Sequence, residues 1–467
     1  MQTTLPWFGK TPPSTPAESA SLDSRVIYYL GSKQRILRSI VEAVSEVAPS
    51  GARVCDLFAG SGAVSRALAA DWVVTGVDIQ EYSRVLTNAA LNPTDISHPA
   101  WDTVVSRARV SQLRSTLTQS LSGLLRYELL ALQQARDKDA TQLAGLCDAA
   151  PLETVGERLS EVHDAVLDLI GESYKRLVSE GLGRGADTVI TRYYGGVYFT
   201  WQQAIDLDCL LAEIHRYSGT VRDSLLAAAF GTASEAVNTI GKHFAQPLQL
   251  KSTSGEIKRH LVAQSLRDRS VDVFATYGTF RDRLGRNGWV RRGHRAVRSD
   301  YREFLANPSE VFDAVYADPP YTRDHYSRFY HILETMALHD EPSVSSTLIR
   351  SSRRRPSRGI YRVERHQSPF CIQSLAEGAL DDLGRMVASR SVPLILSYSP
   401  YSSVAGNRPR LMSLEIVTEV MRRHFARIRV RSVDGLSHSK FNRRDRNVTV
   451  DYPAEALLVC EPSAASS

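Results

Sequence analysis

The sequence has few of the features that define a protein class at first sight. Its five cysteines stand apart, at positions 55, 147, 209, 371 and 460, and none forms a CxxC pair. This spacing argues against a structural zinc site or a disulfide framework and is typical of a cytoplasmic chain. The sequence has no run of about 18 apolar residues, so no membrane span is expected. Residues 1–24 lack the apolar core of a signal peptide and, being rich in Pro, Ser and Thr, are expected to form a disordered tail.

Net charge is also small, since 57 basic residues face 51 acidic residues and leave +6. The basic residues are clustered in three arginine-rich runs, at 281–298, 350–366 and 421–447. Such runs can be solvated surface, or they can neutralise the phosphates of a nucleic acid. The excess of arginine over lysine favours bidentate contacts to phosphate or to guanine edges.

The order of the expected elements indicates an interrupted α/β domain. A helical pattern covers about 25–48, and two buried strands with a helix between them follow, at about 52–59 and 72–79. Long helical patterns then fill about 100–265. Strand patterns return from about 296 onward, and the last of them, at 454–460, is expected to have no chemical role. We predict a doubly wound sheet with a large, mainly helical insert.

A glycine-rich turn follows the first predicted strand, in the sequence DLFAGSGAVS at 56–65. Phe58, Gly60 and Gly62 form an F-x-G-x-G pattern between strand and helix. Glycines let the backbone turn tightly and approach a ligand, and the helix start adds oriented amide groups. Plain turns share this pattern, so other motifs must decide between the two interpretations.

An acidic residue, Asp78, stands at the end of the next predicted strand. A carboxylate at this place can accept hydrogen bonds from both hydroxyls of a ribose. The dinucleotide pattern G-x-G-x-x-G is absent, because position 65 is a serine. The pair of motifs therefore favours a nucleoside cofactor without a pyrophosphate, such as S-adenosylmethionine.

A second loop is marked by Asp318, Pro319, Pro320 and Tyr321, directly after a short apolar run. Prolines cannot donate hydrogen bonds to a sheet, so the strand must end here and leave an acid and a ring on a stiff loop. Ligands of doubly wound sheets sit beyond the carboxyl ends of the strands, where the strand order reverses. If the two motif strands flank that point, one loop holds the cofactor and the other holds the acceptor.

Together, the DPPY and FAGSG motifs resemble those of the amino-methylating DNA methyltransferases. The order YYLGSK (28–33), FAGSG, VDIQ, a long insert, RSDYREFL (298–305) and DPPY is similar to that of the alpha group, the Dam-type DNA adenine methylases. The segment at 318–337 resembles the restriction-associated branch of that group, with Thr322 in place of an asparagine and Asp324-His325 in place of a glutamine. The resemblance covers about 25–90 and 295–460.

This resemblance implies a class I fold dependent on S-adenosylmethionine and methyl transfer to the N6 amine of an adenine flipped out of DNA. Asp318 and the carbonyl of Pro319 would accept hydrogen bonds from that amine, with Pro320 stiffening the loop and Tyr321 stacking on the base. No metal is implied. Cofactor contacts are expected from Tyr29, Gly31, Lys33, Asp56, Phe58, Gly60, Gly62, Asp78 and Asp300.

The same resemblance divides the chain into a catalytic domain of 25–95 plus 295–462 and a helical target recognition insert of 96–294. The expected partners are double-stranded DNA and a cognate restriction or defence protein. Two alternatives stay open: an amino-methyltransferase acting on cytosine N4 or on RNA, and an inactive DNA-binding regulator. The recognition sequence and the oligomeric state do not follow from the sequence.

Overall fold

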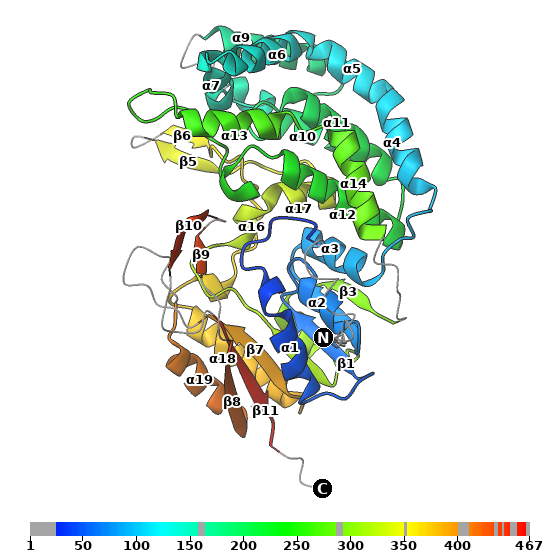
Figure 1. Cartoon of the computed structure of the whole chain (residues 1–467), viewed down its shortest axis with the longest axis vertical. Coiled ribbons are helices and arrows are strands. Elements are labelled where there is room, and N and C mark those ends of the chain that lie inside the picture. The colour runs from blue at the N-terminus through cyan, green and yellow to red at the C-terminus, as the bar shows by residue number, and fades with distance from the viewer. Residues whose placement is uncertain are drawn as a thin grey trace, which may run out of the picture.

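A computed structural model describes residues 25–156, 164–285, 293–349, 353–399, 411–433, 438–440, 443–448 and 455–463. Figure 1 shows two layers along the long axis, a helical body above an α/β body. The α/β body contains the strands β1 (Arg53–Leu57), β2 (Val73–Asp78), β3 (Arg295–Arg298), β4 (Ala314–Ala317), β7 (Leu394–Tyr398), β8 (Arg427–Val433) and β11 (Glu455–Glu461).

These strands form one seven-stranded sheet in the order β3-β2-β1-β4-β7-β11-β8. The pairs from β3 to β7 are parallel, whereas β11 is antiparallel to both of its neighbours. Chain order runs one way from β1 to β3 and the other way from β4, so the reversal lies between β1 and β4. This is the class I methyltransferase arrangement, and it confirms the predicted doubly wound fold.

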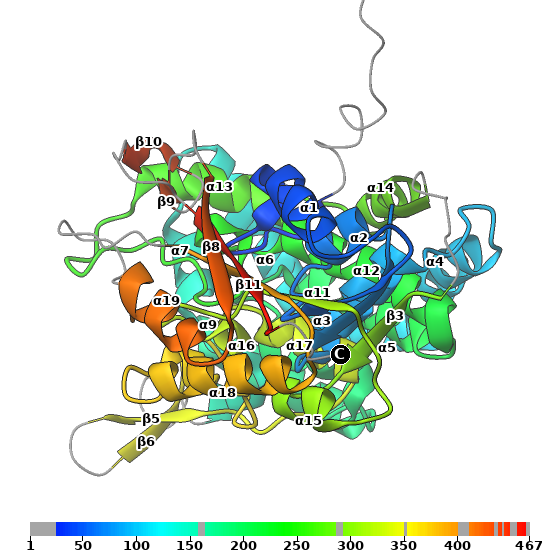
Figure 2. The same ribbon diagram turned by 90° about the horizontal axis from the view of Figure 1, so that it is seen from below.

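Both faces of the sheet are buried, because helices cover each of them, and successive side chains of a strand point to opposite faces. Leu57, Leu394 and Leu396 face a core shared with α15 (Tyr301–Ala306), α18 (Ala376–Ser389) and α19 (Leu414–Arg422). Val54 and Val74 face the opposite core, with η1 (Lys33–Arg35), α1 (Leu37–Ser45) and α2 (Ala63–Leu68) beside it. Figure 2 shows the sheet from below, with α1 and α2 on one side and α15 and α18 on the other.

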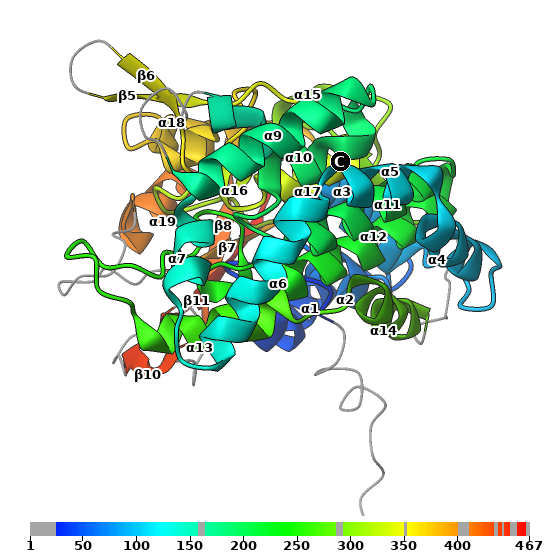
Figure 3. The same cartoon turned by 90° about the horizontal axis from the view of Figure 1, so that it is seen from above.

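The helical body lies over the carboxyl edge of this sheet, and Figure 3 looks down onto it. Its core also takes in residues of α3 (Glu81–Leu91) and α17 (His331–Leu338), two helices that adjoin the sheet. The α-helices that the structure describes in the rest of this body are α4 (Ala100–Val110), α5 (Gln112–Ser120), α6 (Ser122–Arg136), α7 (Thr141–Asp148), α9 (Ala165–Ser179), α10 (Val189–Tyr194), α11 (Trp201–Ile214), α12 (Gly219–Ala236), α13 (Arg259–Arg269) and α14 (Val273–Gly285).

Two small hairpins stand apart from the main sheet and were not predicted. One pairs β5 (Ser346–Ile349) with β6 (Arg353–Pro356), and the other pairs β9 (His438–Lys440) with β10 (Arg443–Val448). The strand β6 of the first hairpin lies in the arginine-rich run 350–366, and the second hairpin overlaps the run 421–447. Within the described ranges, no helix is long and apolar enough to cross a bilayer.

One predicted element begins later than expected. The helical pattern suggested a helix over about 25–48, but α1 begins only at Leu37. Residues 25–32 instead run without helix or strand, and Gly31 takes a φ of 73°. The apolar residues that gave this segment a helical pattern pack it against the helical body instead, since Ile27 and Leu30 belong to the core of that body.

Candidate active site

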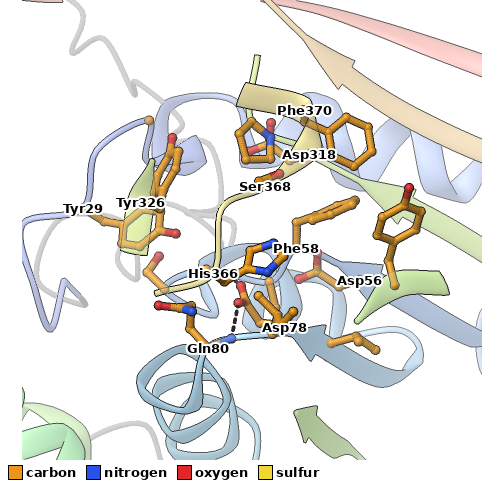
Figure 4. Close-up of a pocket in the computed structure, with 18 of the residues that line it drawn as sticks. Tyr29, Asp56, Phe58, Asp78, Gln80, Asp318, Tyr326, His366, Ser368 and Phe370 are labelled. Carbon is orange, nitrogen blue, oxygen red and sulfur yellow. Dashed lines mark hydrogen bonds between the residues drawn. The ribbon is translucent and has the colours of Figure 1, made fainter. Parts of the chain in front are cut away.

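Two loops open into one cavity at the carboxyl edge of the sheet. One is the glycine loop, residues 58–62, and the other is the Asp-Pro-Pro-Tyr loop, residues 318–321, which we call the acceptor loop. Gly60, Asp78 and Asp318 all line the cavity, although they lie at or just beyond the ends of three different strands. The space, including its open mouth, is about 1080 Å³, as large as a site for a sizeable small molecule. Figure 4 shows the side chains that surround it.

Most of the residues predicted to bind a cofactor line this cavity. They are Tyr29, Gly31, Lys33, Asp56, Phe58, Gly60, Asp78 and Asp300, and on the acceptor side Asp318 and Pro320 line it as well. Gly62, Pro319 and Tyr321 do not. Gly62 has φ 75° and precedes α2, and a Cβ there would lie 2.8 Å from the Cα of Thr87. Its glycine is therefore required by the close packing of the turn on α3.

The glycine loop is held in an unusual backbone conformation. Phe58 and Gly60 have φ of 63° and 58°, and a bulky residue at positive φ costs about 1–3 kcal/mol. The ring of Phe58 packs 5.5 Å from Tyr301 and 5.4 Å from Phe370, measured between ring centroids. A Cβ on Gly60 would lie 2.7 Å from the Tyr29 hydroxyl. The loop thus brings backbone close to the cavity and places one aromatic ring in its wall.

Asp78 ties the start of this loop to the next helix. Its two carboxylate oxygens accept backbone N–H groups from Gly60, at 3.0 Å, and from Gln80, at 2.9 Å. Burial raises the pKa of Asp78, and the two hydrogen bonds oppose that rise. Glu334 of α17 holds α3 in turn, since its carboxylate accepts the N–H groups of Glu81 and Tyr82 at 3.1 and 3.0 Å.

Asp56 lies at the bottom of the cavity, in the centre of the sheet. It is 1% exposed, and Ser65 of α2 donates its hydroxyl to the carboxylate at 2.5 Å. Burial raises the pKa of Asp56 to about 7, with the charges of Asp318 and Asp78 adding to the rise. The bond from Ser65 shows that Asp56 anchors α2 against β1.

Asp318 projects into the cavity from the end of β4 and forms an ion pair with Lys33, 3.0 Å away. Burial raises the pKa of Asp318 to about 6, and Lys33 limits that rise. Lys33 also lies 2.7 Å from Glu455 and donates to the Tyr321 hydroxyl at 3.4 Å. Lys33 was predicted only as a cofactor contact, so the ion pair adds a link to the carboxylate of the acceptor loop.

Several residues of the cavity were not predicted. Gln80 could have been found, because it follows Asp78 by two positions at a strand end. Glu455 begins the last strand, which was expected to have no chemical role, and it reaches the cavity through Lys33. The other unpredicted lining residues include Tyr326, His366, Ser368 and Phe370.

One segment accounts for three of these residues. In Figure 4 His366 lies beside Asp78, and Ser368 and Phe370 follow on the same segment toward Asp318. Ser327, just after the acceptor loop, donates to the backbone carbonyl of His366 at 2.6 Å. Burial lowers the pKa of His366, which keeps its imidazole neutral near pH 7. No motif marks this segment, since only the folded chain brings it over the cavity.

The described residues contain no group of three or more His, Cys, Asp or Glu side chains that could hold a metal ion. The cavity is lined by the carboxylates of Asp78, Asp300 and Asp318 and by residues of two aromatic clusters. One cluster contains Phe58, Tyr301 and Phe370. In the other, Tyr29 stacks on Tyr330 with centroids 5.1 Å apart.

The fold and the site together define a class I methyltransferase body with an elaborated acceptor loop. The D12 class N6 adenine-specific DNA methyltransferase family matches residues 29–121 and 292–368 of this chain. The matched ranges contain the glycine loop, Asp78 and the DPPY loop, so the resemblance inferred from the sequence motifs is confirmed.

A curated relative agrees with this match. The modification methylase LlaI of Lactococcus lactis subsp. lactis is 23% identical over 381 residues, which cover 80% of this chain and 46% of the relative. The chain therefore spans less than half the length of that relative. The family match supports the prediction of adenine methylation in DNA, and the relative is by name a modification methylase.

Proposed function

We propose that this protein transfers a methyl group from S-adenosylmethionine to the N6 amine of an adenine flipped out of double-stranded DNA at a specific site. The observation that carries this proposal is the shared cavity, in which the glycine loop with Asp78 faces the acceptor loop with Asp318. The family match and the modification methylase relative support the same reaction.

The residues that line the cavity fit S-adenosylmethionine. Asp78 is fixed by two backbone N–H groups, yet each carboxylate oxygen keeps a lone pair for a ribose hydroxyl. Phe58 and Phe370 pack edge to face, with an interplanar angle of 84°, so an adenine ring would stack on the face of one of them. Asp300 would contact that ring or the amide groups beside it. Tyr29, Gly31 and Lys33 would surround the methionine part.

When bound, this cofactor supplies a methyl group on a sulfonium sulfur, whose C–S bond breaks toward sulfur as the N6–C bond forms. The amine of adenine is a poor nucleophile, because its lone pair is delocalised into the ring. Asp318 and the carbonyl of Pro319 would accept its hydrogens and favour a more tetrahedral nitrogen, and positioning supplies most of the acceleration. The proton that leaves N6 passes to Asp318 or to water.

The base must leave the duplex to reach this cavity, and Tyr321 would replace the stacking that it loses. Tyr321 does not line the cavity itself, but it belongs to the same loop as Asp318 and is held by Lys33 and by an edge contact with Tyr398, 5.5 Å between centroids. The nearby helical insert, residues 96–294, would act as the target recognition domain. Residues 25–95 and 295–462 would form the catalytic domain.

A restriction or other defence system is the proposed context, with a cognate nuclease as partner. The relative is by name a modification methylase, which supports this context. All five cysteines are free and buried, in agreement with a reducing cytoplasm.

The test is to incubate the protein with methyl-labelled S-adenosylmethionine and duplex DNA and then to digest the DNA to nucleosides. We expect the label in N6-methyladenine. Label in N4-methylcytosine, or in RNA only, would assign the reaction to another acceptor. No label in any nucleic acid, with cofactor binding retained, would favour a DNA-binding regulator and contradict the proposal.

A further inference from the structure

A buried glutamate outside every motif reaches the acceptor loop. Glu455 is the first residue of β11, the strand that runs against its neighbours. Because β11 is reversed, its first residue lies at the sheet edge where the parallel strands β4 and β7 end. A glutamate at this place therefore points to the same edge as Asp318.

Glu455 is bound from two sides. One carboxylate oxygen lies 2.7 Å from the ammonium of Lys33 and accepts the hydroxyl of Ser397, on β7, at 2.9 Å. The side chain is 11% exposed, and that of Lys33 is 6% exposed. A carboxylate and an ammonium this far from water are stable only when paired, because desolvation of each costs several kcal/mol.

Lys33 has three N–H groups and three partners in this cluster. They are Asp318 at 3.0 Å, Glu455 at 2.7 Å and the Tyr321 hydroxyl at 3.4 Å. Two of these partners belong to the acceptor loop, and Glu455 is the third. Without Glu455, the ammonium would have only the acceptor loop to bind and could pair fully with Asp318.

The charges of the cluster give Glu455 an electrostatic effect on the reaction. Two carboxylates face one ammonium, so the cluster keeps a negative charge beside the acceptor loop. The target amine gains positive charge as it is methylated, and a fixed negative charge nearby stabilises that change. Pairing of Lys33 with Asp318 alone would cancel this charge.

We propose that Glu455 is a positioning residue for methyl transfer: it holds Lys33 so that the ammonium orients Asp318 and Tyr321 without neutralising the carboxylate that faces the amine. This inference rests on the proposed function and adds to it a residue of the last strand. Other ionisable groups also lie close to Asp318: burial, and with it the charge of Asp318, raises the pKa of Asp56 on β1, of Tyr316 on β4 and of Tyr326 on α16 (Tyr326–Phe329).

The kinetic test compares Glu455→Gln and Lys33→Gln with the wild-type chain. We expect Glu455→Gln to lower kcat about 10- to 100-fold, the effect of one lost bond to a charged group, with cofactor affinity nearly unchanged. Asp318 must be ionised to accept the amine hydrogens. Removal of the nearby negative charge lowers the pKa of Asp318, so the acid limb of kcat moves to lower pH. Removal of the positive charge in Lys33→Gln moves it to higher pH.

A matched control lies on the same strand. Glu461, at the far end of β11, pairs with Arg429 at 3.0 Å and is remote from the cavity, so Glu461→Gln should retain the wild-type kcat and pH profile. Shifts of the acid limb in the same direction for Glu455→Gln and Lys33→Gln, or no shift in either, would overturn the proposal. A merely structural role for Glu455 does not produce opposite shifts.

A second readout is independent of methylation. In protein labelled with 13C at the lysine ε carbons, the Lys33 signal is assigned by its loss in Lys33→Gln. Burial alone would lower the pKa of Lys33, but Asp318 and Glu455 hold it well above its usual value. Glu455→Gln should lower this pKa, and an unchanged titration would overturn the inference even if the enzyme is active. Absence of adenine methylation by the wild type would contradict the proposed function instead.

Discussion

Asp318 is the residue to which the proposed reaction assigns the acceptor of the amine hydrogens, and its surroundings explain how it could act near neutral pH. Burial disfavours its charged form, whereas Lys33 favours it, and its pKa settles at about 6. The carboxylate is thus mostly ionised at pH 7 and available as an acceptor. Below about pH 6 it becomes protonated, so methylation should decline as the pH falls through this value.

Replacement of Asp318 by alanine tests its role toward the target amine separately from binding of the methyl donor. We expect Asp318→Ala to lower kcat at least about 100-fold, because a positioned acceptor is removed, while S-adenosylmethionine still binds at the Asp78 side. Methylation assays and titration calorimetry measure the two effects. Asp313→Ala is the matched control, since Asp313 precedes the same strand and forms an exposed ion pair with Arg53. Full turnover in Asp318→Ala would contradict its role.

At the scale of elements, the turn after β1 determines how closely a ligand approaches the backbone. Gly60 combines a φ of 58° with a cavity-lining position, and the Tyr29 ring beside it is itself stacked on Tyr330. Because Tyr330 holds the Tyr29 ring in place, that ring cannot easily move aside for a side chain at position 60.

Gly60→Ala should weaken binding of S-adenosylmethionine at least about tenfold, because a Cβ would meet the Tyr29 hydroxyl at 2.7 Å and left-handed backbone costs alanine about 1–2 kcal/mol. Calorimetry with the purified variant tests this. Gly145→Ala, in the middle of α7 with open space around it, should bind the cofactor as the wild type does. Equal affinity in both variants would show that the turn is not part of the cofactor site.

Elements with a strong sequence pattern were predicted correctly, and those that depend on tertiary contacts were not. The strands around Cys55 and Val315 are apolar runs because both faces of the sheet are covered, and such runs are visible in a sequence. The β5–β6 hairpin is arginine-rich and has no such pattern. Glu455 and His366 reach the site only because β11 is reversed and because residues 366–370 cross over the cavity, and neither fact is encoded locally.

On the scale of the whole molecule, the helical body shares its hydrophobic core with α3 and α17, which belong to the catalytic part of the chain in the proposed division, whereas the sheet packs in two cores of its own. α3 begins at the cofactor side of the cavity and α17 follows the acceptor loop, and both pack among the helices of the upper body (Figure 1). A duplex held by the helical body would therefore be linked through packed helices to both loops of the site.

Binding of DNA should depend on salt through the arginine-rich hairpin. Arg354 is exposed on β6, and Arg358, which follows it, is exposed and pairs with Asp148 at 3.1 Å. We expect Arg354→Gln with Arg358→Gln to weaken binding and to flatten the slope of log K against log salt by about 0.9 for each phosphate that is no longer neutralised. Arg38→Gln serves as control, because the Arg38 side chain is exposed on the outer face of α1. An unchanged slope in the double variant would exclude this hairpin from the interface.

The central claim is that the glycine loop and the acceptor loop act on two ligands in one cavity. A crystal structure of the protein with S-adenosylhomocysteine and duplex DNA tests it most directly. We predict the cofactor ribose at Asp78, its sulfur toward Asp318, and an extruded adenine between Asp318 and Tyr321. A cofactor bound outside the cavity lined by Gly60 and Asp318, or an adenine that stays stacked in the duplex, would contradict the account.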